Sequence, residues 1–531
     1  MVSKTNKMLL ASLAIVFFLS TIMASYSVTD AEPTGPVYIK SDGSIDPPTA
    51  PIMNLNNKTY TLSADMNDSI IIQRSDISMD GAGFSIHGPG VFVNYTTGIL
   101  LQNVTNVTVK NFHLEAFLFG IRVDSSSNMT FVGNNVTNNG DGFHLTNVNN
   151  SKFVQNVMIR NQNVTLFYGI VAYNSCSNLF LQNTIAGNGN SGLRTSFTSN
   201  DTIIRNNITG THEFGLRLES AFNDTISGNI IRGCHTGIWA YPSGRNMISN
   251  NTIVSNDDAG VRLEYAETMN NQIHNNILRN NTNGILLRQS SDFNSITANS
   301  ISDNTVGIEI SETANNTIYH NNFLSNIQDI SEIDSQNTWD NGLEGNYWNS
   351  YNGKDNDQDG IGDSPLQINA NNTDHYPLMG IFCDFNLKTE TENLYCVQVI
   401  SNSTILNVTI FYWNATTNQY FQNGQAYIRI DLATEPNSTG FGRVTFPKAL
   451  LNATQYVVLV NMTETPTMTL TDPDSALAIV YFQYNDSAHD AIIVPEFSLL
   501  GVIFMILVGS AGLSAYSVRR GREDPSLSTK T

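Results

Sequence analysis

Side chains able to bind or cleave a polar polymer recur at one position of a regular spacing. Four of the ten arginines between residues 98 and 330 stand two residues after a repeated glycine. Two residues further on, the same stretch carries tyrosine or glutamate. Aromatic faces stack on sugar rings, and arginine and carboxylate groups hydrogen-bond hydroxyls or acidic groups. We therefore expect a sugar-binding strip made of Arg194, Arg217, Glu219, Trp239, Tyr241, Arg262 and Glu264.

Carboxylates and an imidazole border this strip. Carboxylates about 5 Å apart perform acid–base chemistry in enzymes that cleave glycosidic bonds. The candidate catalytic residues, for a lyase or a hydrolase, are Glu213, His235, Asp257 and Asp258. Because the combined Asn-Thr-Asp, Asp-Asp and Gly-His-Gly set of polygalacturonases is not matched, binding is favoured over catalysis. A third interpretation stays open, in which the same arginines and rings only stabilise a solvated sheet face.

An acidic segment around Gly360 is the one metal-like motif of the chain. Alternating carboxylates before a glycine suit Ca²⁺, which prefers oxygen ligands. The twelfth position of an EF-hand count is Leu366 rather than Glu, which excludes a two-helix EF-hand. The alternative is a polar turn that caps the repeat region and covers its open β-edge. The predicted ligands of a structural Ca²⁺ ion are Asp355, Asp357, Asp359 and Asp363.

A repeat of about 23 residues must position these side chains, since nine intervals between ten glycines cover 209 residues. Units this short cannot bury a core alone and must stack on their neighbours. Each holds short strand-like segments and polar turns, without helical periodicity. The chain is therefore predicted to be all-β, with a right-handed parallel β-helix of about ten or more coils spaced by about 4.8 Å. The glycines are Gly98, Gly120, Gly142, Gly169, Gly192, Gly215, Gly237, Gly260, Gly284 and Gly307.

Asparagine recurs with the same period. Stacked side-chain amides satisfy one another and the turn backbone, so an inward ladder is expected. The repeated glycines are assigned to sharp corners, because glycine tolerates strained backbone conformations. The predicted ladder consists of Asn135, Asn156, Asn183, Asn207, Asn229, Asn251, Asn276, Asn299 and Asn322.

Both ends of the repeat region resemble NosD-like parallel β-helix proteins. The resemblance rests on Val37–Ile45 and Asp80–Gly83 at the start, and on Gly345–Trp348, Asp357–Pro365 and Tyr376–Leu378 at the close. It implies a β-helix with an Asp-rich cap over residues 37–380, an architecture shared with carbohydrate-binding and sugar-hydrolase proteins. NosD proteins are linked to copper delivery for nitrous oxide reductase. Copper favours clustered Met, His or Cys, and no Met-x-x-Met or His-x-x-His pair occurs, so only the fold is carried over.

Residues 381–490 lose the repeat and alternate polar with apolar residues, as in Tyr456–Val460. Such short segments predict an antiparallel β-sandwich of immunoglobulin-like type. Gly440–Pro447 resembles the juxtamembrane sandwich of other archaeal surface β-helix proteins, which implies a stalk. In an oxidising compartment, Cys383 and Cys396 are expected to form a disulfide.

Both ends of the chain carry targeting features. Residues 1–31 combine lysines with an apolar run and predict a signal peptide. Residues 495–522 hold about 20 uncharged residues followed by arginines, which predicts a membrane anchor with residues 523–531 as a cytoplasmic tail. Pro495-Glu496-Phe497 resembles the archaeal sorting signals presented to archaeosortases, so a sorting enzyme is an expected partner.

Composition narrows the function further. The net charge of −20 argues against nucleic acid as a partner, because phosphate binding needs a basic face. Sequons such as Asn103 and Asn407 agree with a secreted, glycosylated surface. We expect a membrane-anchored cell-surface protein that binds a polysaccharide or a partner surface, in adhesion or in the envelope. The alternatives are a carbohydrate-active lyase or hydrolase and a purely structural envelope spacer.

Overall fold

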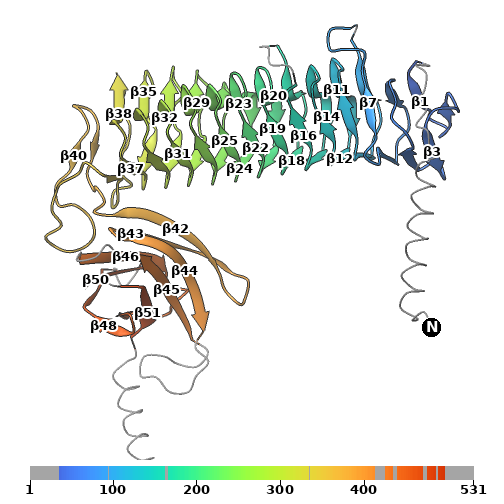
Figure 1. Cartoon of the computed structure of the whole chain (residues 1–531). Coiled ribbons are helices and arrows are strands. Elements are labelled where there is room, and N and C mark those ends of the chain that lie inside the picture. Colours follow the sequence, from blue (N-terminus) through green and yellow to red (C-terminus); the bar gives the residue numbers. More distant parts are fainter. Residues whose placement is uncertain are drawn as a thin grey trace, which may run out of the picture. The chain divides into compact units, whose positions relative to one another are not determined.

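The computed structural model of the 531-residue chain shows an all-β protein (Figure 1). It divides into two compact units. The first contains the chain up to Asn341 together with Gln367–Thr373, and the second contains Gly342–Leu366 and the chain from Asp374 onward. The residues that the structure describes are 35–93, 95–161, 166–333, 335–412, 425–433, 439–470, 475–485 and 488–496.

The predicted targeting segments fall almost entirely outside these ranges. The signal peptide at residues 1–31 and the tail at 523–531 are not among them, and of the anchor at 495–522 only Pro495 and Glu496 are described. Within the described ranges, no helix is long and apolar enough to cross a membrane.

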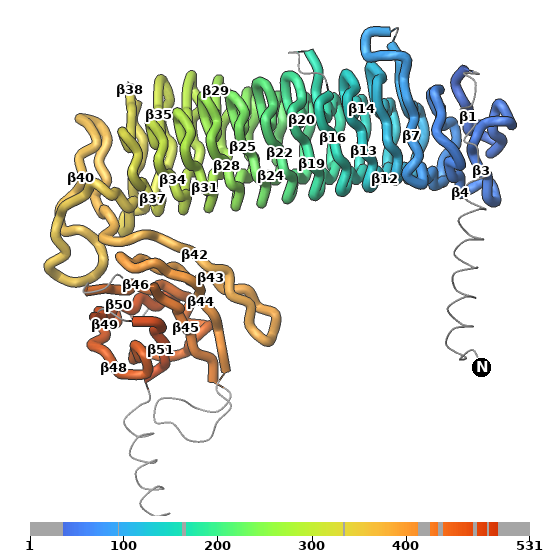
Figure 2. Tube along the Cα trace, viewed as in Figure 1, coloured from blue at the N-terminus to red at the C-terminus, as the bar shows by residue number. Residues whose placement is uncertain are grey.

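The first unit is a right-handed parallel β-helix, in which successive coils of the chain stack along one axis (Figure 2). Each coil contributes one strand to each of three sheets, as the repeat predicts. Sheet A contains β2 (Ile45–Asp46), β1 (Val37–Ile39), β5 (Ile70–Ile72), β8 (Thr97–Gln102), β11 (Phe119–Ser127), β14 (Asp141–Asn149), β17 (Tyr168–Tyr173), β20 (Ser191–Ser199), β23 (Phe214–Phe222), β26 (Thr236–Tyr241), β29 (Ala259–Glu264), β32 (Asn283–Arg288), β35 (Val306–Ser311) and β38 (Gln328–Ile333).

The other two sheets are built from shorter strands. Sheet B contains β3 (Ile52–Leu55), β4 (Thr59–Leu62), β6 (Ile77–Asp80), β9 (Val107–Lys110), β12 (Thr130–Val132), β15 (Lys152–Val154), β18 (Leu179–Leu181), β21 (Thr202–Ile204), β24 (Thr225–Ser227), β27 (Met247–Ser249), β30 (Gln272–His274), β33 (Ser295–Thr297) and β36 (Thr317–Tyr319). Sheet C includes β7 (Ser85–His87), β10 (His113–Glu115), β13 (Asn135–Val136), β16 (Val157–Ile159), β19 (Thr184–Ala186), β22 (Asn207–Thr209), β25 (Ile230–Arg232), β28 (Thr252–Val254), β31 (Ile277–Arg279), β34 (Ser300–Ser302) and β37 (Asn322–Leu324).

The repeated glycines are explained by close approach between coils rather than by sharp corners. A Cβ atom on Gly237 would lie 2.5 Å from the carbonyl oxygen of Gly260 and 2.6 Å from the Ile253 side chain. None of the ten repeated glycines has a positive φ, whereas turn residues such as Asn250 do. Glycine therefore lets the backbone of one coil lie directly against the next, and asparagine makes many of the left-handed turns.

The expected asparagine ladder exists, but three of its rungs are one residue earlier. The side-chain amide of Asn183 donates to Asn206 Oδ1 at 2.9 Å, and that of Asn206 donates to Asn229 Oδ1 at 3.0 Å. The inward rungs are Asn134, Asn206 and Asn321, so the assignments of Asn135, Asn207 and Asn322 are wrong. Each error falls in an Asn-Asn pair, where only the strand boundary decides which side chain points inward.

The second unit contains a two-sheet antiparallel sandwich, with buried side chains from both sheets, such as Val444 and Ile428, in one core cluster. One sheet contains β42 (Ile381–Lys388), β43 (Leu394–Ser401), β46 (Thr439–Pro447), β50 (Leu477–Asn485) and β49 (Thr467–Thr469). The other contains β44 (Thr404–Tyr412), β45 (Ala426–Ala433), β51 (Asp490–Pro495), β47 (Tyr456–Val460) and β48 (Thr463–Thr465). The short strands β39 (Tyr347–Trp348), β40 (Leu366–Gln367) and β41 (Thr373–Asp374) precede the sandwich in the chain.

The predicted disulfide in this unit is not formed. Cys383 lies opposite Val399 in the β42–β43 pair, and Cys396 lies opposite Asn386. Residues 396 and 399 are three apart, and alternate residues of a strand point to opposite faces, so the two sulfur atoms belong to opposite faces of the sheet. Both cysteines are free thiols. Burial raises the pKa of Cys383 to about 11, which keeps this thiol protonated at neutral pH.

Candidate functional site

The predicted strip lies on four consecutive strands of sheet A. Arg194 lies opposite Arg217, Arg217 opposite Trp239, and Trp239 opposite Arg262 in the parallel register. Neighbouring strands are about 4.8 Å apart, so these side chains form one line across β20, β23, β26 and β29. The stacking that the glycine alignment predicts is confirmed, and the binding role of the strip stays a prediction.

Arg194 is held by three neighbouring side chains. Its Nη2 and Nε atoms donate to Glu219 Oε2 at 2.6 and 3.1 Å, and its Nη1 donates to the hydroxyls of Tyr168 and Tyr173 at 2.8 Å. The guanidinium also lies 5.5 and 5.1 Å from the centroids of these two rings. Burial opposes its charge, but the phenols and Glu219 outweigh that effect and raise the pKa of Arg194. The side chain is 14 % exposed, so a fixed guanidinium still meets solvent.

Trp239 lies in a stack of aromatic rings. Its indole stacks on Phe214 and on Tyr241, with centroids 4.5 and 4.1 Å apart. The Arg217 guanidinium lies over all three rings at 5.5, 5.1 and 5.3 Å, and it donates to the Tyr241 hydroxyl. These cation–π contacts lower the cost of burying Arg217 Nε, which has no hydrogen-bond partner. The ring stack and the Arg217 guanidinium therefore hold each other in position.

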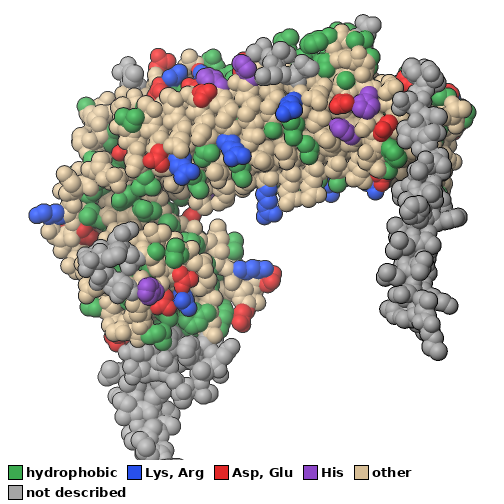
Figure 3. Space-filling model, viewed as in Figure 1, with side chains coloured by type: hydrophobic (Ala, Val, Ile, Leu, Met, Phe, Trp, Pro, Cys, Tyr) green, Lys and Arg blue, Asp and Glu red, His purple; other side chains and the backbone are tan. Residues whose placement is uncertain are grey.

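Arg262, at the end of the strip, is hydrogen-bonded to two carboxylates. Its Nη2 and Nε donate to the two oxygens of Glu264 at 2.8 and 3.1 Å, and its Nη1 donates to Asp258 Oδ2 at 3.2 Å. Glu264 also accepts from Trp239 Nε1 at 3.2 Å. Each arginine of the strip thus has a carboxylate partner, and the charges balance. Figure 3 likewise shows basic, acidic and histidine side chains interspersed along the β-helix of the first unit (the rod), rather than separated into positive and negative patches.

The candidate catalytic residues are distributed around the strip rather than gathered at one point. Glu213 Oε2 accepts from Asn190 at 3.0 Å, and Asp258 accepts from Thr236 and Arg262. His235 is exposed in the turn before β26. Asp257 lines a shallow cleft at a corner of the rod together with Asn280, Asn281 and Asp303. Of the four candidates, Asp258 is the one that forms an ion pair with an arginine of the strip, Arg262.

The structure adds residues that the sequence reasoning missed. Tyr168 and Phe214 each precede a repeated glycine, so the same alignment read one position earlier finds them. Asp141 shares that position and bonds His144 at 2.8 Å; burial raises its pKa, and His144 partly offsets the effect. Phe197 and Tyr265 stand five residues after a glycine, with φ of 55° and 72°, and are 63 % and 46 % exposed. Phe197 lies within β20 and Tyr265 directly follows β29. Their large exposed rings occupy left-handed backbone positions where a polar residue is more usual.

The acidic segment in the second unit brings together three of its four predicted ligands. Carboxylate oxygens of Asp355, Asp357 and Asp359 lie within 4.8 Å of one another. Asp363 instead accepts from the backbone of Asn356 at 2.9 Å. Burial raises the pKa of Asp355 and of Asp359 above that of a free aspartate.

Arg443 holds this segment from the neighbouring strand β46. It donates to Glu344 at 2.8 Å and to the Asp359 carbonyl at 2.8 Å, and its side chain is buried. A Cβ atom on Gly360 would lie 3.2 Å from Arg443, so glycine allows this approach. The segment is thereby tied to the sandwich of its own unit.

The carboxylates of this acidic segment do not suit copper. Copper favours imidazole, thiolate and thioether ligands. Among the residues that the structure describes, the three aspartates are the one group of three or more His, Cys, Asp or Glu side chains placed to share an ion. Carboxylates alone suit hard cations such as Ca²⁺ or Mg²⁺ instead.

Comparison with known proteins gives a family. The profile of the family described as "Periplasmic copper-binding protein (NosD)" matches residues 54–240 and 210–353, together more than half of the chain. The "Probable ABC transporter binding protein NosD" of Pseudomonas aeruginosa is 37% identical over 81 residues. That match spans 15% of this chain and 19% of the relative.

Two solved structures align with this chain at low sequence identity and with low TM-scores. The Dettilon tailspike protein is 12% identical, with a TM-score of 0.35, over 80% of this chain and 87% of its own. The periplasmic alginate epimerase AlgG is 12% identical, with a TM-score of 0.33, over 54% of this chain and 80% of its own. The family match, the closing sequence block and the three-sheet coil agree with one another. The chain belongs to the NosD family of parallel β-helix proteins.

Proposed function

We propose that this protein binds a polysaccharide outside the cytoplasm, along the outward face of sheet A. The observation that carries the proposal is the line of Arg194, Arg217, Trp239 and Arg262 across four consecutive strands. The side chains of the three arginines are 14 to 22 % exposed and are fixed by carboxylates and rings. Fixed donors lose little side-chain entropy when a ligand binds.

The charge balance narrows the class of polymer. Arg194, Arg217 and Arg262 are matched by Glu219, Glu264 and Asp258. A face without net charge has no preference for an anionic chain, but it offers alternating donors and acceptors to hydroxyl groups. The exposed rings of Phe197 and Tyr265 supply stacking surface for sugar rings. A hydroxyl-rich polysaccharide lying across the strands fits both features.

The experiment is a glycan array probed with the wild type and with a variant carrying Arg194→Gln and Arg217→Gln. We expect wild-type binding to at least one polysaccharide and at least a tenfold weaker affinity in the variant, about 1.4 kcal/mol. Trp239→Ala, which removes the centre of the ring stack, is expected to weaken binding as well. Far-UV circular dichroism checks that each variant is folded.

The matched control carries Arg232→Gln and Arg279→Gln, which remove two exposed arginines from β25 and β31 of sheet C. Its affinity should equal that of the wild type. Absence of binding by the wild type would leave the structural spacer as the function, with the strip as a stabilising ladder. Turnover of the bound polysaccharide, lost in Arg217→Ala, would instead support the lyase or hydrolase alternative.

We also propose a cell-surface setting of archaeal type. Residues 1–31 would direct export, residues 495–522 would anchor or sort the protein, and the sandwich would act as an immunoglobulin-like stalk. The acidic segment would hold one structural Ca²⁺ ion through Asp355, Asp357 and Asp359. Membrane fractionation of the full-length protein and of a chain truncated after Glu496 tests the anchor: the truncated chain should leave the membrane fraction.

A further inference from the structure

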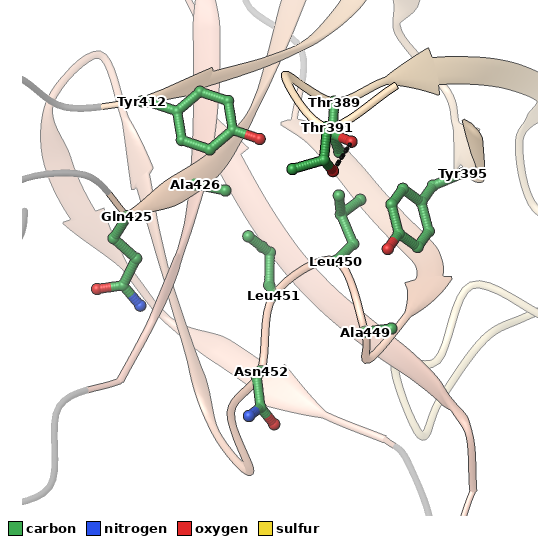
Figure 4. A pocket seen from close by; sticks show the side chains of 10 residues that line it. All are labelled: Thr389, Thr391, Tyr395, Tyr412, Gln425, Ala426, Ala449, Leu450, Leu451 and Asn452. Carbon is green, nitrogen blue, oxygen red and sulfur yellow. Dashed lines mark hydrogen bonds between the residues drawn. The ribbon is translucent and has the colours of Figure 1, made fainter. Parts of the chain in front are cut away.

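The sandwich contains a cavity that belongs to no site described so far. Its volume is about 360 Å³, and it opens at one end of the two sheets. The residues around it come from the β42–β43 turn, from the ends of β43, β44 and β45, and from the segment between β46 and β47 (Figure 4). The lining residues are Thr389, Thr391, Tyr395, Tyr412, Gln425, Ala426, Ala449, Leu450, Leu451 and Asn452.

Apolar and aromatic groups shape the cavity. Leu450 and Leu451 are buried members of the sandwich core and also line the cavity, so the cavity has a rigid base. Figure 4 shows Tyr395 and Tyr412 on opposite sides, with the two leucines between them. Two rings flanking an apolar base form a slot of the kind that accepts a flat apolar face. Its volume lies in the range of about 300–1,000 Å³ typical of small-molecule sites.

The polar groups of the cavity are all neutral. The hydroxyls of Thr389 and Thr391 lie 3.0 Å apart, and the exposed Asn452 lies at the opposite end of the cavity (Figure 4). Gln425 Oε1 is buried and has no hydrogen-bond partner, so it is an acceptor without a donor. None of the lining residues carries a charge. A charged ligand would be desolvated here without a counter-charge, whereas a hydroxyl would satisfy Gln425.

We propose that this cavity is a second carbohydrate site, which binds one or two residues of a neutral sugar between Tyr395 and Tyr412. A sugar ring combines an apolar face for the tyrosines with hydroxyl donors for Gln425 and the threonines. The site lies within the second unit, so it does not depend on the strip of sheet A. The proposal therefore stands or falls separately from the function proposed for the rod.

The test is saturation-transfer NMR and calorimetry on the full extracytoplasmic chain, with maltose, cellobiose and lactose as probes. We expect at least one of these to bind to the wild type and Tyr412→Ala to weaken its affinity at least tenfold. Gln425→Leu provides a sharper variant. It removes an unsatisfied buried acceptor, so the melting temperature should stay the same or rise while the affinity falls.

Two control variants test the specificity of this site. Tyr376→Ala removes an exposed tyrosine of the same unit that does not line the cavity, and it should leave binding unchanged. The Arg194→Gln, Arg217→Gln variant should also bind these disaccharides as the wild type does. The proposal is overturned if no probe binds the wild type, or if Tyr412→Ala and Gln425→Leu both bind normally. Loss of binding in the arginine variant alone would place all binding on the rod.

Discussion

The rod and the sandwich both bury apolar side chains, such as Ile238 and Val444, and the rod adds rows of buried asparagines. The rod buries rows of asparagines, each bonded to the equivalent residue one coil away, as in Asn206 to Asn229 at 3.0 Å. The sandwich packs Val444, Phe446 and Ile428 in a core cluster of apolar and tyrosine side chains. A buried amide is stable only when all its donors and acceptors are paired. In the rod, repetition at the strand spacing supplies hydrogen-bond partners for the buried amides. The sandwich core has no such repetition.

The largest expected effect comes from breaking one rung. In Asn206→Ala, the backbone and side-chain N–H groups of Asn183 lose their acceptor, and the Phe180 carbonyl loses a donor. Each buried group left unpaired costs about 1–3 kcal/mol. We expect the free energy of unfolding to fall by about 4 kcal/mol, measured by urea titration with circular dichroism.

The adjacent asparagine is the matched control for this rung. The Oδ1 atom of Asn207 has no hydrogen-bond partner, so Asn207→Ala should cost less than about 1 kcal/mol. Equal costs for the two variants would show that the ladder does not distinguish them, and the contrast between rod and sandwich would lose its basis.

The next effect tests the contact between coils. The added Cβ atom of Gly237→Ala would approach the Gly260 carbonyl oxygen to 2.5 Å, and backbone has little room to move. Overpacking of this kind costs up to about 3 kcal/mol. Gly210→Ala meets no atom within 4 Å and adds only the strain of a φ of 59°, about 1 kcal/mol. Thermal melts of both variants measure the difference, and a larger loss in Gly210→Ala would contradict it.

A weaker effect, this time a gain in stability, is expected from replacing two buried aspartates. Asp201 and Asp224 stand in a buried row of the rod whose other members include asparagines. Asp201 and Asp224 each accept a backbone N–H, and each leaves Oδ2 buried without a partner. Burial raises the pKa of Asp201 to about 8, with a contribution from the charge of Asp224, and burial raises the pKa of Asp224 to about 7.

The sign of the pH dependence follows from these directions. In the unfolded chain both groups titrate near 3.8, so stability is greatest in acid and declines as the pH rises from about 4 to about 8. The Asp201→Asn, Asp224→Asn variant should gain roughly 2 kcal/mol at pH 8 and show a flatter pH profile. Denaturation at pH 4, 6 and 8 measures both, and a variant that is less stable at pH 8 refutes the assignment.

The smallest effect is expected in the second unit. If Asp355, Asp357 and Asp359 bind Ca²⁺, an excess of the ion should stabilise that unit by about 1–2 kcal/mol. Calorimetry with Ca²⁺ and with a chelator should shift one melting transition and leave that of the rod in place. Asp357→Asn should abolish the shift, while Asn106→Ala on the rod should not. A shift of the rod transition alone would place the ion elsewhere.

The sequence predicted the rod well because its errors average out over many repeats. Ten glycines at a spacing of about 23 residues predict stacking, and the register places Arg217 opposite Trp239 as the alignment requires. Single events were harder to predict. The inward rung is Asn206 and not the neighbouring Asn207, and the sheet register separates Cys383 from Cys396.

What the sequence alone determined is the period, and with it the columns of residues, because every coil must repeat at the strand spacing. Only the tertiary structure decided which side chains of different columns contact each other. Tyr168 reaches Arg194 from the preceding coil, and Phe214 completes the stack on Trp239. The spacing gives the column in which Tyr168 and Phe214 stand. It does not give the neighbour that each contacts, because that depends on side-chain rotamers and on the exact position of each turn.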